Sequence, residues 1–98
     1  MNYITTTEDL KKLCKDIKQT TDIVAIDTEF DKHNSYFPII CIVQIGYFDG
    51  VEFKKYIVDM MIKEMDLKPF ESILQSKKIK KVIHSLSEDI LAFYYKFK

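Results

Sequence analysis

A run of apolar side chains between Ile39 and Gly46 constrains the fold of this chain more than any other feature. The run, Ile-Ile-Cys-Ile-Val-Gln-Ile-Gly, carries apolar residues at both odd and even positions. Successive side chains of a strand point to opposite faces of a sheet, so this segment has two apolar faces. Strands of that kind are typical of a sheet interior. The polar Gln44 within the run needs hydrogen-bond partners there.

The hydrophobic periodicity around this strand predicts the element order α-β-β-β-α-β-α. Helices are expected over roughly 7–19, from Leu67 to Leu74, and from the capping-box spacing of Ser85 and Glu88 onward. The first expected strand begins with the β-branched run Ile23–Ile26 and ends in Asp27-Thr28-Glu29. The others are Ile39–Gly46, Val51–Val58 and Lys80–His84, with an Asp49-Gly50 hairpin turn. A three-strand antiparallel meander followed by a β-α-β crossover predicts a mixed sheet, with the last strand parallel to the first.

The composition excludes several classes of protein. The 98 residues are 47% hydrophobic and 31% charged, which is typical of one globular domain and atypical of a disordered chain. No run of about 20 apolar residues is present, so we expect no membrane partner. Two cysteines fit a reducing, cytoplasmic location. The 15 basic residues, all Lys, balance 15 acidic ones, so a polyanion must be held locally by lysines, backbone amides or bound metal.

Asp27 and Glu29 are the strongest local sign of chemistry. They lie two residues apart after the β-branched run Ile23–Ile26, so a strand would place both carboxylates on one face. Two partly desolvated carboxylates repel each other, and a divalent cation such as Mg²⁺ or Mn²⁺ between them removes that cost. The alternative interpretation is a pair of solvated carboxylates at the end of a strand.

Asp89 and His84 are further candidates at the same edge. Both follow or end the strand Lys80–His84, and ligands gather at the carboxyl ends of strands in open sheets. Asp89 is equally explained by the helix N-terminus, which stabilises negative charge, and His84 by a structural hydrogen bond. The lysine-rich segment 77–81 either approaches phosphates or is a solvated loop.

Two segments resemble, in this order, the motifs of ribonuclease D-like 3′–5′ exonucleases of the DEDD superfamily. Ile23-Val-Ala-Ile-Asp-Thr-Glu-Phe30, then Tyr36-Phe-Pro38 and Cys41-Ile-Val-Gln-Ile45, are similar to the first exonuclease motif and the strand after it. His84-Ser-Leu-Ser-Glu-Asp89, continuing to Phe93, is similar to the second motif. The similarity extends from the first expected strand to the last residue.

This resemblance implies a ribonuclease H-like α/β fold with flanking helices, and two-metal phosphodiester hydrolysis with Mg²⁺ or Mn²⁺. It assigns Asp27, Glu29 and Asp89 as catalytic metal ligands. It places Phe30, His84 and Phe93 in contact with substrate, which would be the 3′ end of RNA or of another single-stranded nucleic acid.

The family's third motif, a Tyr followed four residues later by Asp, has no counterpart within residues 1–98. We therefore expect the chain to be the truncated N-terminal half of an exonuclease domain for RNA 3′-end trimming, inactive alone. The alternative is a non-catalytic or split-gene module. Such a module would associate with a separate C-terminal half, or with itself, through its aromatic last helix.

Overall fold

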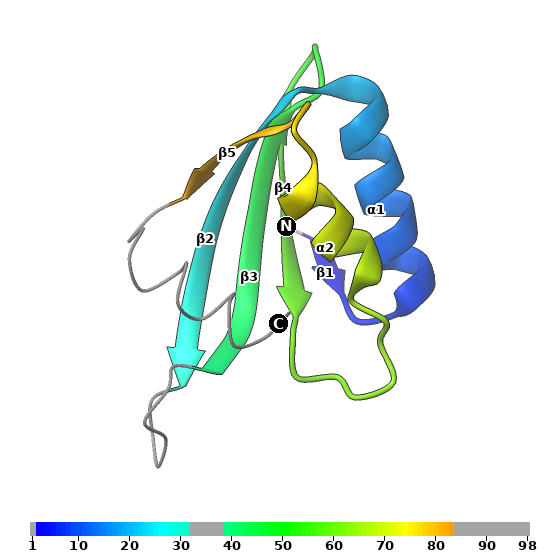
Figure 1. Ribbon diagram of the computed structural model, residues 1–98, viewed down its shortest axis with the longest axis vertical. Helices are drawn as coiled ribbons and strands as arrows, with labels where there is room; N and C mark the ends of the chain where they lie inside the picture. Colours follow the sequence, from blue (N-terminus) through cyan, green and yellow to red (C-terminus); the bar gives the residue numbers. More distant parts are fainter. Residues whose placement is uncertain (1, 32–38, 84–98) are drawn as a thin grey trace.

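A five-stranded mixed sheet forms the centre of the computed structural model, which describes residues 2–31 and 39–83. The elements are β1 Asn2–Ile4, α1 Thr7–Thr20, β2 Ile23–Asp31, β3 Ile39–Phe48, β4 Phe53–Asp59, α2 Lys68–Gln75 and β5 Lys80–Ile83. The strand order across the sheet is β1-β4-β3-β2-β5, so β3 is the central strand, as the sequence predicts (Figure 1).

The strand directions match the expected topology. β2, β3 and β4 form an antiparallel meander, and β5 lies parallel to β2 with Ile23 opposite Lys80. One strand was not predicted: the short β1 pairs in parallel with β4 and places Tyr3 opposite Ile57. The sheet therefore has five strands instead of four.

β2 is longer than the sequence indicated. The sequence predicted a strand that begins with the β-branched run Ile23–Ile26 and ends in Asp27-Thr28-Glu29, whereas the strand continues to Asp31. The polar residues remain in strand geometry because β3 pairs with them in register, Asp27 with Gln44 and Glu29 with Ile42. The two acidic residues therefore lie within a paired strand.

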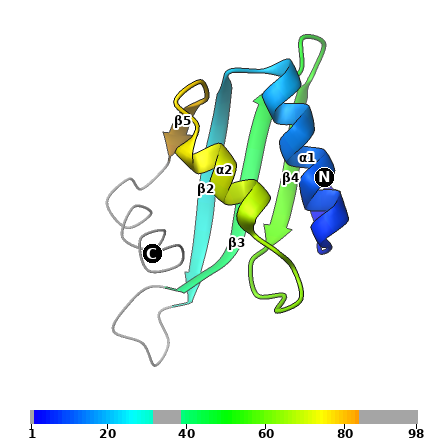
Figure 2. The same ribbon diagram turned by 45° about the vertical axis from the view of Figure 1, so that its right-hand side comes forward.

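Both helices pack on one face of the sheet (Figure 2). Helix α1 is amphipathic and buries Leu10, Leu13, Cys14 and Ile17, and α2 buries Phe70 and Ile73. Alternate residues of the central strands meet them, among them Val24, Ile26, Val43, Ile45 and Val58. Within the described residues, neither helix covers the opposite face of the sheet, which we call the open face.

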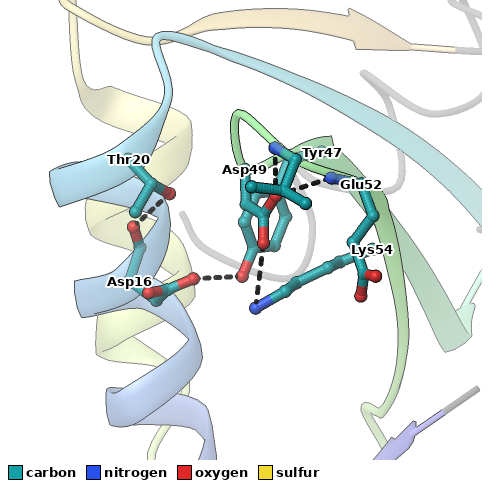
Figure 3. A network of polar contacts seen from close by, with 7 residues as sticks. Asp16, Thr20, Tyr47, Asp49, Glu52 and Lys54 are labelled. Atoms are coloured by element: carbon teal, nitrogen blue, oxygen red, sulfur yellow. Dashed lines mark hydrogen bonds and ion pairs between the residues drawn. The ribbon is translucent and has the colours of Figure 1, made fainter.

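Figure 3 shows two sets of polar contacts, of which one joins α1 to β3 and the other lies within the turn between β3 and β4. The Tyr47 hydroxyl donates to the Asp16 carboxylate at 2.5 Å. In the turn, the Asp49 carboxylate accepts from the backbone N–H groups of Val51 and Glu52, each at 2.8 Å, and forms an ion pair with Lys54. The expected hairpin turn is thus present, although it is longer than two residues because β4 begins at Phe53.

In the part of the chain that the structure describes, no helix has the length and apolar character needed to cross a membrane.

Candidate functional site

The two acidic residues singled out in the sequence lie side by side on the open face. Asp27 and Glu29 alternate along β2 with Ile26 and Thr28, and Ile26 is buried under the helices. Asp27 and Glu29 are both exposed to solvent, so the core does not fix their side chains. The structure confirms that the two carboxylates share one face, which is the arrangement that their spacing predicted.

An irregularity in strand pairing lies directly beside this pair. Glu29 is opposite Ile42, but the next residue, Phe30, is opposite Ile40, so the register shifts by one residue at Cys41 of β3. On its other side, the Cys41 carbonyl accepts a hydrogen bond of 2.9 Å from the backbone N–H of Met60, the residue after β4. Bulges of this type bend a strand and change the direction of the residues around them. The extra residue belongs to β3, so the irregularity lies in β3, opposite the step from Glu29 to Phe30 of β2.

A hollow of about 510 Å³ lies next to Asp27 on this side of the sheet. Its polar side chains are those of Asp27, Gln44 and Lys55, one from each strand of the meander. Phe53 also lines it, close to Gly46: a Cβ atom added at that glycine would approach the Phe53 ring to 2.6 Å. Sequence reasoning did not single out Lys55 and Phe53, because their position depends on the pairing of β3 with β4.

β5 lies next to β2 and runs in the same direction, so its last residues lie near Asp27. Its last described residue, Ile83, lies opposite Ile26 in parallel register. The end of the described part of β5 therefore lies beside Ile26, the residue that precedes Asp27 in β2. The other predicted site residues, His84, Asp89 and Phe93, lie outside the described residues, and of Phe30 only its pairing position in β2 is described.

The lysine-rich segment 77–81 lies at the other end of these strands. Lys80 pairs with Ile23, and its backbone N–H donates to the Asp22 carbonyl at 2.7 Å. The Lys81 ammonium donates to the Ser76 carbonyl at 2.5 Å. Because Asp27 is near the opposite end of the β2–β5 pairing, the structure does not bring these lysines to the acidic pair.

The large pKa shifts lie away from this site, in the core and its border. Burial raises the pKa of the Cys14 thiol to about 12. Burial, together with the hydrogen bond to Asp16, raises the pKa of Tyr47. Among the described residues no group of three or more His, Cys, Asp or Glu side chains could hold a metal, so this part of the chain supplies two carboxylates to the site.

The model of the 3′-5′ exonuclease family matches residues 1–98. The chain belongs to this family. Among curated relatives of this chain, ribonuclease D of Nitrobacter hamburgensis is 33% identical over 92% of the chain, and that of Granulibacter bethesdensis is 36% identical over 96%. The chain spans 22% of the length of each relative.

Solved structures show the same fold as this chain. The crystal structure of Escherichia coli RNase D, an exoribonuclease involved in structured RNA processing, matches 99% of the chain with a TM-score of 0.81 and 32% identity. The catalytic core of RRP6 from Trypanosoma brucei matches 91% with a TM-score of 0.77 and 25% identity. The chain covers 25% and 23% of these structures. The predicted ribonuclease D-like family and ribonuclease H-like α/β fold are confirmed.

Proposed function

We propose that this exonuclease domain contributes to hydrolysis of the 3′ end of RNA by two-metal catalysis, with Asp27 and Glu29 as metal ligands. The observation that carries the proposal is the position of both carboxylates. They share the open face of β2, at the edge where β5 ends. The relatives that are named ribonuclease D support RNA as the substrate class.

The described residues fit a hard divalent cation. Carboxylate oxygens are the ligands that Mg²⁺ and Mn²⁺ prefer, and both side chains are exposed, so a hydrated ion can reach them. Asp89 is the proposed third ligand, carried over from the resemblance. Metal ions held by these carboxylates would supply the chemistry of water activation and charge stabilisation that phosphodiester hydrolysis needs.

The protein's own residues would bind and orient the substrate. Asp27 and Glu29 would hold the metal ions, and their spacing of two residues along β2 places both carboxylates on the same side of the sheet. Phe30, His84 and Phe93 are the proposed substrate contacts. In this proposal residues 1–98 form part of an exonuclease domain and hold three of its four carboxylates. The 98-residue polypeptide by itself should therefore hydrolyse RNA very slowly.

Metal binding tests the acidic pair directly. In a Mn²⁺ titration followed by electron paramagnetic resonance, Asp27→Asn and Glu29→Gln should each weaken binding by about tenfold or more, because each removes a ligand charge. Asp22→Asn is the matched control, since Asp22 is an exposed acidic residue just before the other end of β2. Equal Mn²⁺ affinity in the wild type, Asp27→Asn and Asp22→Asn would refute the proposed site.

An RNA digestion assay tests whether the three proposed carboxylates are sufficient for hydrolysis. A 3′-labelled RNA incubated with Mg²⁺ and the 98-residue polypeptide should remain largely intact. Rapid digestion that Asp27→Ala abolishes would show that three carboxylates are sufficient, and would contradict this part of the proposal.

An alternative function, a non-catalytic module that associates with a separate chain, is supported by the open face. Large apolar side chains are exposed there in the described part of the chain: Tyr3, Ile23, Phe48, Phe53 and Val82. Obligate association predicts that the chain elutes from a sizing column above its monomer mass of 11.6 kDa. A monomer with a cooperative thermal transition would contradict it.

A further inference from the structure

Gln44 is the one polar residue within the apolar run of β3, and strand pairing places it directly opposite Asp27. Residues that face each other across antiparallel strands have Cβ atoms about 4.5–5.5 Å apart and point to the same side. Its other neighbour, across β4, is the apolar Ile57. Both Gln44 and Asp27 line the hollow on the open face.

Within the ranges 2–31 and 39–83, no hydrogen bond is found for the Gln44 carboxamide. It is half-buried in a strand whose other residues are apolar. A partly desolvated amide lowers stability unless it has a hydrogen-bond partner, and the described residues supply none, so the packing of the described part of the fold does not account for a glutamine here. An apolar side chain of the same size would suit the position better.

We infer that Gln44 is a positioning residue for Asp27 when a metal ion is bound. One Asp27 oxygen would face the ion, and the Gln44 N–H would donate to the other oxygen. Metal-binding carboxylates are generally held by such hydrogen bonds, and loss of the donor typically weakens metal binding about 10- to 100-fold. This inference rests on the proposed metal site.

The amide suits this task because it is neutral. A lysine opposite Asp27 would compete with the cation for the carboxylate, and an acidic residue would add a third negative charge. Glutamine supplies a donor without changing the charge of the site. A stability cost at Gln44 would then be explained by metal binding.

Gln44→Met tests the inference, because methionine has nearly the same length and no donor. We expect the variant to bind Mn²⁺ about tenfold more weakly than the wild type while its melting temperature stays equal or rises by a few degrees. Gln75→Met is the matched control. Gln75 also donates to a carboxylate, that of Glu71 at 3.2 Å, but it lies on α2 under the other face of the sheet.

A measurement on the unsubstituted side chain complements the variant. Adding Mg²⁺ to ¹⁵N-labelled protein should shift the side-chain amide signals of Gln44, and Asp27→Asn should abolish that shift, while the Gln75 signals stay in place.

The outcomes separate the inference from the proposed function. Wild-type affinity for Mn²⁺ in Gln44→Met, with Asp27→Asn still impaired, would overturn the role of Gln44 alone. A marked fall in the melting temperature of Gln44→Met without a Mg²⁺-dependent shift of the Gln44 amide would show that the residue is structural. If the wild type itself binds no Mn²⁺ through Asp27, the proposed function fails, and the inference fails with it.

Discussion

Tyr47 shows how a single side chain fixes a helix to the sheet. Its ring is 1% exposed, it stacks with Tyr56 at 6.2 Å between ring centroids, and its hydroxyl ends on the Asp16 carboxylate of α1 (Figure 3). A buried hydroxyl requires a partner, and a charged acceptor forms a stronger bond than a neutral one. Asp16 in turn is held within α1, whose Thr20 hydroxyl donates to the Asp16 carbonyl at 2.7 Å.

Tyr47→Phe should lower the free energy of unfolding by about 1.5–3 kcal/mol, the usual worth of a hydrogen bond to a charged group. The ring remains in place, so the loss reports the hydroxyl alone. Urea denaturation at neutral pH measures it. Tyr3→Phe is the control: Tyr3 is 64% exposed, so its change should stay within about 0.5 kcal/mol. Equal stability of the two variants would show that the Asp16 bond contributes nothing.

Some residues of the site could be placed from the sequence alone, and others depend on contacts between distant segments. Asp27 and Glu29 could be placed on one face because alternation along a strand is local. Gln44 was visible as an anomaly, but its place opposite Asp27 depends on the register between two strands. Tyr47 and Asp16 are 31 positions apart, and no local pattern joins them.

At the scale of elements, the long periodic segments were predictable and the short paired ones were not. Helix α1 matches its expected range to within one residue because four apolar side chains recur along it at helical spacing. β1 has only three residues, and it is a strand because it pairs with the outer side of β4. β2 extends through polar residues for the same reason, since pairing with β3 outweighs the weak strand propensity of Asp and Glu.

The β3–β4 turn gives a test at this scale through two glycines. Gly50 has a φ of +99° with open space around it, whereas Gly46 lies against the Phe53 ring. Gly50→Ala should therefore cost about 1–2 kcal/mol through backbone strain alone. Gly46→Ala should cost less, because Phe53 is 55% exposed and its ring can move aside. Thermal denaturation ranks the two variants, and the reverse order would show that Phe53 is fixed in place.

At the scale of the whole molecule, the described sheet has two unlike faces. One is packed under α1 and α2 and contains the core, and the other carries the acidic pair, the hollow and exposed apolar side chains. The groups with strongly raised pKa values, Cys14 and Tyr47, belong to the packed face. At alkaline pH, the change in the free energy of unfolding should therefore come in part from these two groups of the packed face.

Cys14 gives that dependence a definite sign. Burial raises the pKa of its thiol from the ordinary value of 9.0 to about 12 in the folded protein. The unfolded chain therefore loses this proton first as the pH rises. The stabilising contribution is complete below about pH 9 and disappears between about pH 9 and 12, at up to about 1.4 kcal/mol per pH unit. Tyr47, whose pKa is also raised, acts in the same direction once the pH passes the ordinary tyrosine value of about 10.

Urea denaturation at about pH 8, 9.5 and 10.5 should show a falling free energy of unfolding in the wild type. Cys14→Ala should begin lower, because it leaves a small cavity under α1, and should then lose less stability over the same interval because its titrating group is gone. Between about pH 7 and 8 the two proteins should run parallel. If the curves remain parallel up to about pH 10.5, the Cys14 thiol titrates alike in the folded and unfolded chains, and burial under α1 does not hold its proton.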